Sequence, residues 1–295
     1  MRVVVTGGSG HIGRAIVDEL LDHGHQVTSA DRQPGVSSAA PLRLVDLEDL
    51  GQVVGMLDGC DAVVHAAAIP RPGISSDHVL FRTNMMTLFN VLEACRMLGI
   101  PRLVWTSSMS VLGYPFNYRP ITPRYLPFDE RHPQDPQDPY ALSKAFGEQL
   151  CDAYAARCAL TITSLRIVWA HTPDTFKRDL LPFWDDPAAG ANNLWSYVDT
   201  RDCGRAVWLA LGRSAGGHRA CFISAPDTCM PISTRDLVAR YLLNAPTIAD
   251  SLPTYGALFN TARAQELLGF QAQYTWESYG LGARPHLEQP IIEGE

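Results

Sequence analysis

A tyrosine and a lysine four residues apart are the clearest chemical signal in the sequence. Tyr140 and Lys144 occupy one face of an expected helix over 140–156, because residues i and i+4 are neighbours on a helix. A tyrosine with a pKa of about 10 is a poor acid–base catalyst at neutral pH, and a nearby cation lowers that pKa. A compact ammonium can also donate to ribose hydroxyls, whereas a guanidinium is larger and differently directed. The pair therefore predicts acid–base chemistry, with Lys144 supporting Tyr140.

Lysine is rare in this chain, which adds weight to its position. Lys144 and Lys177 are the two lysines, against 22 arginines. A general preference for arginine accounts for the total, and we expect Lys177 to be ordinary surface charge.

A glycine-rich turn near the N terminus predicts a phosphate site. Gly7, Gly10 and Gly13 follow an apolar run at 3–6 and open a helical pattern at 12–22, with His11 and Ile12 inside the motif. The three glycines permit a tight turn, close approach of backbone to a pyrophosphate, and close helix–strand packing. The N terminus of the helix then offers free N–H donors to the phosphates.

The second expected strand ends in an acidic residue at the position that binds the adenosine ribose in dinucleotide-binding folds. Asp31 lies eighteen residues beyond Gly13, where a carboxylate accepts from the ribose hydroxyls and repels a 2′-phosphate. The alternative is that Asp31 is a turn former at a strand end. We predict NAD rather than NADP, although the neighbouring Arg32 could pair with a 2′-phosphate.

The elements that must hold these residues alternate in type along the chain. Short apolar runs with helical patterns between them indicate right-handed crossovers and a Rossmann-type, doubly wound parallel sheet of the α/β class. The expected strands are 3–6, 26–30, 42–45, 61–66, 103–106, 161–165 and 220–224, and the expected helices are 12–22, 79–97, 140–156, 200–211, 234–243 and 261–268.

The domain division follows from this rhythm. We expect an NAD-binding domain over 1–165, whose sheet a strand near 220–224 completes, and a small, discontinuous substrate lobe made mainly by 166–295. The connection over 107–139 carries seven of the 21 prolines and several aromatic residues. A loop of this length is usually functional or disordered, and its aromatic content favours a packed flank of the active site.

Composition narrows the class of protein. A net charge of −7, with arginines scattered singly, argues against nucleic acid or an anionic membrane as the main partner. Seven cysteines without C-x-x-C spacing suit reduced thiols in a cytoplasm, and no metal site is expected. No apolar run approaches the roughly 18 residues of a membrane span, and the N terminus enters a strand directly. We expect a cytoplasmic enzyme with a small-molecule substrate.

The motifs together resemble the extended short-chain dehydrogenase/reductase superfamily, the branch of NAD-dependent epimerases and dehydratases. The resemblance runs over most of residues 1–225 and weakens thereafter. It rests on the glycine turn, Asp31, Asp46-Leu47, His65-Ala66-Ala67-Ala68, Asn84, Thr106-Ser107-Ser108 with Gly113, and Tyr140-x-x-x-Lys144.

The resemblance implies roles for individual residues. Tyr140 would be the acid–base, Lys144 its electrostatic partner and ribose ligand, and Ser108 the hydroxyl that bonds the reacting oxygen, with Ser107 as the fallback. The cofactor would be contacted by Asp46 and Leu47 at the adenine, by the stretch from His65 through Ala66 and Ala67, and through a loop that Asn84 supports. By residue type alone, Asp46 could be a helix N-cap, His65 a satisfied core histidine and Asn84 an N-cap.

Two positions depart from the sugar-nucleotide enzymes of this branch. Trp169 stands three residues after Arg166, where those enzymes usually carry an asparagine that contacts the nucleotide sugar, and Trp195 stands where an arginine clamps the pyrophosphate. An indole cannot neutralise a diphosphate but offers an apolar or sugar-stacking face. The aromatic residues of this stretch could equally be core of a small lobe. Uronate dehydrogenases are similar in this respect.

We therefore expect an NAD-dependent oxidoreductase that moves hydride between nicotinamide and a secondary alcohol or ketone without a nucleotide handle, such as a free sugar or sugar acid. The alternatives are a sugar-nucleotide epimerase or dehydratase with tightly bound NAD, and a protein that senses NAD without chemistry. The resemblance also implies a homodimer through helices 80–97 and 140–156. Leu142, Phe146 and Leu150 suit such an interface, although burial against the sheet would select similar residues.

Overall fold

A seven-stranded parallel sheet forms the centre of the molecule in the computed structural model, which describes residues 1–284 except 36–38, 214–215, 243, 247 and 283. The strand order is β3-β2-β1-β4-β5-β6-β9. The strands are β1 (Arg2–Thr6), β2 (Gln26–Asp31), β3 (Leu42–Leu44), β4 (Ala62–His65), β5 (Arg102–Ser108), β6 (Thr161–Ile167) and β9 (His218–Ile223). The order reverses between β1 and β4, and a doubly wound sheet binds its ligand at the carboxyl ends of such strands.

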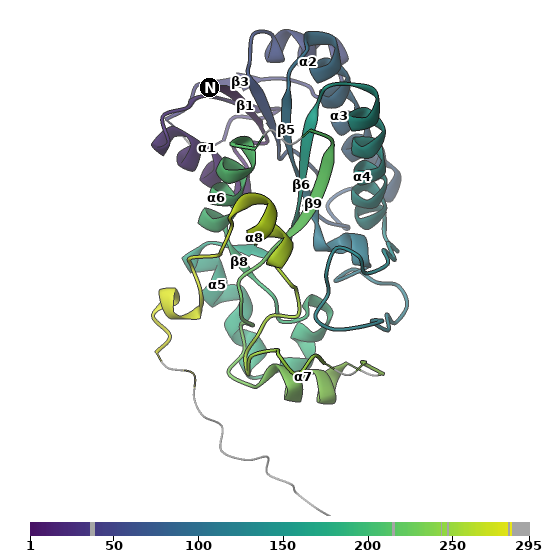
Figure 1. Cartoon of the computed structure of the whole chain (residues 1–295), viewed down its shortest axis with the longest axis vertical. Helices are drawn as coiled ribbons and strands as arrows, with labels where there is room; N and C mark the ends of the chain where they lie inside the picture. Colours follow the sequence, from purple (N-terminus) through teal and green to yellow (C-terminus); the bar gives the residue numbers. More distant parts are fainter. Residues whose placement is uncertain (36–38, 214–215, 243, 247, 283, 285–295) are drawn as a thin grey trace, which may run out of the picture.

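Helices cover both faces of the sheet (Figure 1). One face carries α1 (His11–Asp22) and α6 (Thr200–Leu211), and the other carries α2 (Leu50–Leu57), α3 (Asp77–Leu98) and α4 (Pro139–Arg157). Strands β1, β4 and β5 contribute apolar side chains to both faces, which explains their continuous apolar runs. The fold class predicted from the alternation of strands and helices is confirmed.

A smaller layer lies beyond the carboxyl ends of the strands, at the lower end of Figure 1. It contains a two-stranded parallel sheet of β7 (Ala170–His171) and β8 (Val198–Asp199), and the helices α5 (Pro173–Leu180) and α7 (Thr234–Tyr241). Helix α8 (Ala262–Leu268) ends at Gly269 in the left-handed conformation and packs beside β9. Short 3₁₀ helices are η1 (Met109–Leu112), η2 (Leu181–Trp184), η3 (Pro187–Asn193) and η4 (Trp276–Tyr279).

Most expected elements are present within two residues of their predicted ends. The strand expected at 220–224 is β9, which pairs with β6 and completes the large sheet. Helix α7 ends at Tyr241, two residues before the predicted end, and residue 243 lies outside the described part of the chain. Helix α2 and the elements between 167 and 199 had no assigned prediction, because their short, irregular patterns carry little periodicity.

The long connection between β5 and α4 packs against the smaller layer beyond the carboxyl ends of the strands, which is called the lobe below. After η1 it carries no further helix or strand of the large sheet up to Asp138, and isolated bridges join Leu126 to Ile248 and Phe128 to Phe259. Phe128 is fully buried and stacks on Phe259 at 5.6 Å between ring centroids. The connection is thus a packed part of the structure, as its aromatic content predicted.

Candidate functional site

The end of β5 and the start of α4 bring the expected catalytic residues together. Ser108 is the last residue of β5, and Tyr140 lies in the first turn of α4. Asp138 caps that helix, its carboxylate accepting from the backbone N–H of Tyr140 at 2.8 Å and of Ala141 at 3.1 Å. Pro139 at the first helical position fixes the entry of the chain. The cap therefore sets the orientation in which Tyr140 faces the end of β5.

Lys144 is buried beneath this face. Its Nζ donates to the carbonyl oxygen of Thr106 at 2.7 Å and lies 5.5 Å from the ring centroid of Tyr140 and 4.9 Å from that of Trp105. Burial lowers the pKa of Lys144 to about 7, because the charged ammonium loses solvation. The lysine is therefore held at a pKa near neutrality rather than as a permanent cation.

The phenol of Tyr140 is shifted in the direction opposite to that expected. Burial raises its pKa to about 12, while a hydrogen bond with Ser108 acts to lower it. The depression expected from Lys144 is therefore not present in this structure, where the loss of solvation outweighs the hydrogen bond with Ser108. Ser108 in turn donates to Ser110 Oγ at 3.0 Å, and the ring of Phe116 stands edge-on to Tyr140 at 6.3 Å between centroids.

Ser107 faces the other side of the strand and is not placed with Tyr140. Neighbouring residues of a strand point to opposite faces. Its Oγ donates to the buried carboxylate of Glu148 at 2.8 Å. The fallback assignment of Ser107 to the catalytic hydroxyl or to substrate is wrong in this structure, because its side chain is committed to Glu148.

The glycine turn forms a cradle in which only backbone lies close. A Cβ on Gly13 would lie 2.0 Å from the carbonyl oxygen of Gly7, and one on Gly7, where φ is +70°, would lie 2.6 Å from the backbone nitrogen of Ala67. Gly10 is the N-cap of α1, and no described side chain caps that helix. The first N–H groups of α1 are therefore available to an anionic ligand, so the residues present fit the pyrophosphate of a dinucleotide.

A cavity of about 270 Å³ extends from this turn along the carboxyl ends of β1, β2 and β4. Asp31, at the end of β2, accepts from the backbone N–H of Arg32 at 2.8 Å. Both residues line the cavity. The other lining residues are Gly7, Gly10, Val45, Asp46, Leu47, Glu48, Ala66, Ala67, Ala68, Ile69, Thr83 and Thr87. The wall combines three acidic residues, one of them at a strand end, and one arginine with small, apolar and threonine side chains, which suits a nucleoside.

Asp46 and Asn84 are not helix caps, so the alternative assignment of each as an N-cap is wrong. The cap of α2 is Asp49, whose carboxylate accepts from Gln52 N at 3.1 Å, and Asp46 remains exposed on the cavity wall. Asn84 lies inside α3 and bonds both backbone groups of Ile69, at 2.8 Å and 3.1 Å. Asn84 therefore holds the loop after β4, which contributes Ile69 to the cavity.

Three residues expected beside the cofactor take other roles for their side chains. His65 is a satisfied core histidine, 2.7 Å from Thr6 Oγ1, and burial lowers its pKa to about 3, so only the alanines after it line the cavity. His11 turns its ring to the carbonyl oxygen of Ala170 at 3.1 Å and lines a separate groove of about 660 Å³. Ile12 packs against the apolar core. The prediction that the His65 side chain lines this cavity is therefore wrong. His11 and Ile12 contribute only their backbone to the turn.

The two tryptophans of the lobe differ in position. Trp195 is 0% exposed, its Nε1 donates to the carbonyl oxygen of Pro187 at 2.8 Å, and its ring belongs to the core. The expectation that Trp195 offers a face to substrate is wrong, because packing inside the lobe covers the indole. Trp169 is 43% exposed and lies 4.5 Å from the His171 ring. Trp169 alone of the pair has a surface that a ligand can reach.

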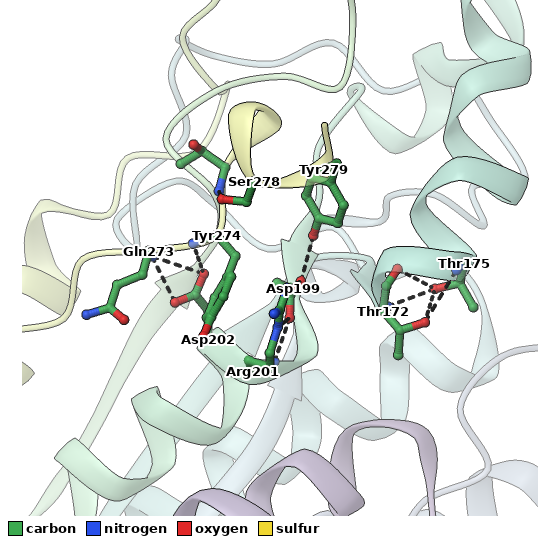
Figure 2. Close-up of polar contacts among 10 residues, drawn as sticks. Thr172, Thr175, Asp199, Arg201, Asp202, Gln273, Tyr274, Ser278 and Tyr279 are labelled. Atoms are coloured by element: carbon green, nitrogen blue, oxygen red, sulfur yellow. Dashed lines mark hydrogen bonds and ion pairs between the residues drawn. The ribbon is translucent and has the colours of Figure 1, made fainter. Parts of the chain in front are cut away.

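Polar contacts fasten the end of the described chain to the start of α6 (Figure 2). The carboxylate of Asp199 accepts from Arg201 and, at 2.8 Å, from the hydroxyl of Tyr279. Asp202 accepts from the backbone N–H groups of Gln273 and Tyr274. The contacts with Gln273, Tyr274 and Tyr279 join segments more than 70 residues apart and fix the position of the lobe.

A family model matches residues 3–221, described as the NAD-dependent epimerase/dehydratase family. The chain belongs to this family. The expectations of the family, of NAD as cofactor and of an enzyme are thereby confirmed, since the match includes the glycine turn, Asp31 and the Tyr140–Lys144 pair. When bound, NAD supplies a hydride acceptor or donor at its nicotinamide ring.

Two curated relatives and one solved structure show how far the likeness extends. L-arabinose 1-dehydrogenase (NAD(P)(+)) of Haloferax volcanii is 32% identical over 79% of this chain and 87% of its own. 2-Alkyl-3-oxoalkanoate reductase of Stenotrophomonas maltophilia is 35% identical over 99% of this chain and 88% of its own. A short-chain dehydrogenase/reductase superfamily protein from Agrobacterium tumefaciens, solved with bound NAD, superposes with a TM-score of 0.72 at 22% identity, covering 95% and 94% of the two chains.

Some residues of the site had no prediction from the sequence. Thr83 and Thr87 line the cavity from α3, Phe116 contacts Tyr140, and Glu148 lies under the catalytic face. Glu148 follows Lys144 by four residues, so the spacing that joins Tyr140 to Lys144 continues for one more turn. That continuation was the available signal, whereas Phe116 lies in a loop without periodicity.

Further features concern the described residues only. All seven cysteines are free. No helix within the described ranges has the length and apolar character needed to cross a membrane. No group of three or more His, Cys, Asp or Glu side chains suited to a metal occurs in that same part of the chain.

Proposed function

We propose that this chain is a dehydrogenase or reductase that moves hydride between NAD and a secondary alcohol or ketone of a small substrate. The proposal rests on one observation: Ser108, Tyr140 and Lys144 form one face where β5 ends and α4 begins. A protein that only senses NAD has no need of this combination of hydroxyl, phenol and ammonium.

In the proposed reaction Tyr140 moves the proton of the substrate hydroxyl. For oxidation the phenolate accepts that proton while hydride leaves the carbon, and for reduction the phenol returns it to the carbonyl oxygen. Ser108, which bonds Tyr140, orients the reacting oxygen. Lys144 supplies positive charge that favours the phenolate, and this charge is needed because burial otherwise raises the pKa of Tyr140.

The lobe supports a substrate without a nucleotide. Trp169 stands at the place of the usual asparagine, and the buried Trp195 leaves no cation at the usual place of the pyrophosphate clamp. The two curated relatives are named for an arabinose and for an oxoalkanoate, neither of which carries a nucleotide. We propose a free sugar, sugar acid or comparable hydroxy or keto compound.

The deciding experiment compares Tyr140→Phe with the wild type and with Tyr118→Phe. A panel of sugars, sugar acids and keto compounds is read by NADH absorbance in both directions. We expect Tyr140→Phe to bind NAD normally and to lose about 10²–10⁴-fold in turnover. The control changes a tyrosine that is 70% exposed and should keep full activity. Retained turnover in Tyr140→Phe would refute the assignment.

A sugar-nucleotide epimerase is the second candidate, since the family includes epimerases. Thermal-shift measurements with UDP-, GDP- and dTDP-sugars separate the two. Clear stabilisation by any of them would favour the epimerase, whereas stabilisation by free sugars or keto compounds would favour the dehydrogenase.

NAD in preference to NADP is also part of the proposal. Asp31 at the cavity wall would repel a 2′-phosphate, and the adjacent Arg32 acts in the opposite sense. Titration with both cofactors tests this: we expect tighter NAD binding, and Asp31→Ala should narrow the difference. Equal or tighter NADP binding by the wild type would contradict it.

We further propose a homodimer through α3 and α4, in the cytoplasm, with the substrate lobe formed mainly from the chain after residue 165. Met86, Phe89 and Phe146 are exposed apolar residues on these two helices, and the free cysteines suit a reducing compartment. Sedimentation should give a dimer at micromolar concentration, and Phe146→Glu should dissociate it. Leu44→Glu, at an exposed position on β3, is the control. A wild-type monomer would reject the dimer.

A further inference from the structure

Helix α4 carries a third polar residue in line with the two catalytic ones. Tyr140, Lys144 and Glu148 follow one another at intervals of four residues on the same face of the helix. The side chain of Glu148 is only 6% exposed, and its partner Arg166 only 5%. Arg166 binds the carboxylate with two hydrogen bonds, from Nε at 2.9 Å and from Nη2 at 2.7 Å.

Two more donors reach the same carboxylate from other elements. Ser107, next to Ser108 at the end of β5, donates at 2.8 Å, and Gln134 of the long connection donates at 3.1 Å. Glu148 therefore ties together α4, β5, β6 and the connection that carries Phe116. These are the elements that position the catalytic face.

Stability alone is a weak reason for such a pair. A buried ion pair loses so much solvation that well-packed apolar residues of the same volume often serve equally well. The place of Glu148 supplies another reason, because it lies one turn beyond the buried Lys144 and beside the neighbour of Ser108.

We propose that Glu148, held by Arg166, is a positioning residue for the reaction proposed above. Its carboxylate fixes the end of β5 that carries Ser108, and its negative charge favours the ammonium form of Lys144. The inference rests on the proposed function for its catalytic meaning, whereas its electrostatic part can be measured without any turnover.

The charge on Lys144 depends on all the groups packed around it. Burial lowers its pKa, whereas Cys151 and the charge of Glu148 act to raise it. Arg166 is bonded to the same carboxylate and carries the opposite charge, so we expect the two members of the pair to act on Lys144 in opposite directions. The groups around the ammonium and the pair are Tyr140, Glu148 and Cys151 on α4, His65 on β4, the Trp105 ring and Thr106 carbonyl on β5, Arg166 on β6, and Glu130 in the connection.

The scarcity of lysine makes this measurable. Lysine labelled with ¹³C at Cε gives two signals in the whole chain, one from Lys144 and one from the exposed Lys177, which is an internal reference. Titrating the intact protein by NMR follows the ionisation of Lys144 directly, and Lys144→Met assigns its signal.

Two variants that break the same ion pair should move that titration in opposite directions. Glu148→Gln removes the favourable charge and leaves the positive charge of Arg166 without its partner, so the midpoint of Lys144 should fall by about one pH unit. Arg166→Gln leaves the carboxylate uncompensated, so the midpoint should rise. The double variant Glu148→Gln with Arg166→Met leaves no unpaired buried charge and should fold, with a midpoint between those of Glu148→Gln and the wild type.

The outcomes distinguish failure of the inference about Glu148 from failure of the proposed function. Asp202→Asn, which weakens a buried contact of the lobe, is the matched control and should leave the Lys144 midpoint unchanged. If all three pair variants lower the free energy of unfolding and leave the midpoint unchanged, the pair is structural and the inference is overturned. If the midpoints move as expected but no substrate supports turnover, the proposed function fails and the electrostatic inference stands.

Discussion

The cofactor half and the lobe of this molecule are built by different kinds of interaction. In the cofactor half, two features are built from residues close in sequence: the strand, turn and helix of residues 2–22, and the cap that orients Tyr140. In the lobe, the same types of residue are placed by distant partners, such as Asp199 with Tyr279 and Asp202 with Gln273. Local sequence therefore determines the turn and the cap, whereas packing between distant segments determines the lobe and also buries Lys144 against Thr106.

The largest effect is expected in the cofactor half, at Gly13. Gly13→Ala places a Cβ 2.0 Å from the carbonyl oxygen of Gly7, so the turn must rearrange. We expect no measurable NAD binding by calorimetry. Gly55→Ala is the control, because a Cβ there meets nothing within 4 Å and alanine should stabilise α2 by about 1 kcal/mol. Normal NAD binding by Gly13→Ala would show that the turn is not the cradle.

The two tryptophans test the lobe. Trp195→Ala empties a fully buried position and should lower the free energy of unfolding by about 3–5 kcal/mol. Trp169→Ala removes an exposed ring, so the change in stability should stay within about 0.5 kcal/mol while the KM for substrate rises. Urea unfolding and steady-state kinetics measure the two. If Trp169→Ala costs as much stability as Trp195→Ala, the distinction between core and ligand surface is wrong.

The buried lysine should make the stability of the cofactor half depend on pH. The pKa of Lys144 is about 7 in the folded chain and near 10.4 when unfolded, so between these values the unfolded chain binds more protons. Stability relative to Lys144→Met should therefore rise with pH above 7, by up to about 1.4 kcal/mol per unit, and should level off above the unfolded pKa. Unfolding at several pH values measures it. A difference that falls over this range would contradict the assigned burial.

A smaller loss of stability than that of Trp195→Ala is expected at the contact that holds the C-terminal segment. Asp202→Ala removes the acceptor for the N–H groups of Gln273 and Tyr274 and should cost about 1–3 kcal/mol. Proteolysis should begin near this segment, and NAD binding should remain. Asp18→Ala, at an exposed position of α1, should have no effect. Loss of NAD binding in Asp202→Ala would mean that the two regions are more tightly coupled than their contacts suggest.

Sequence patterns predict the cofactor half well for physical reasons. The glycines that allow close approach of the backbone to a ligand can be identified directly in the sequence. The spacing of Tyr140 and Lys144 follows from the helical repeat. The sheet and its crossovers follow from the alternation of apolar strands with helices. The likeness to the family extends this to Asp46 and Asn84, whose residue types alone favoured helix caps.

The remaining features depend on what surrounds a side chain. Trp195 and Trp169 look alike in sequence, and only the packing of the lobe buries one and exposes the other. The pKa of Tyr140 is raised because the loss of solvation exceeds the effect of the hydrogen bond with Ser108, and that balance is a property of the folded site. His65 similarly turns into the core to meet Thr6, 59 residues away.

The most direct test of the central claim is the stoichiometry of NADH release with a substrate found in the panel. Purified wild-type enzyme is supplied with excess NAD, and NADH is counted against the substrate consumed. The face formed by Ser108, Tyr140 and Lys144 predicts one NADH released for each alcohol oxidised. In Tyr140→Phe the rate of NADH release should fall by about 10²–10⁴-fold. Conversion of substrate without any release of NADH would contradict the account and identify an epimerase or dehydratase instead.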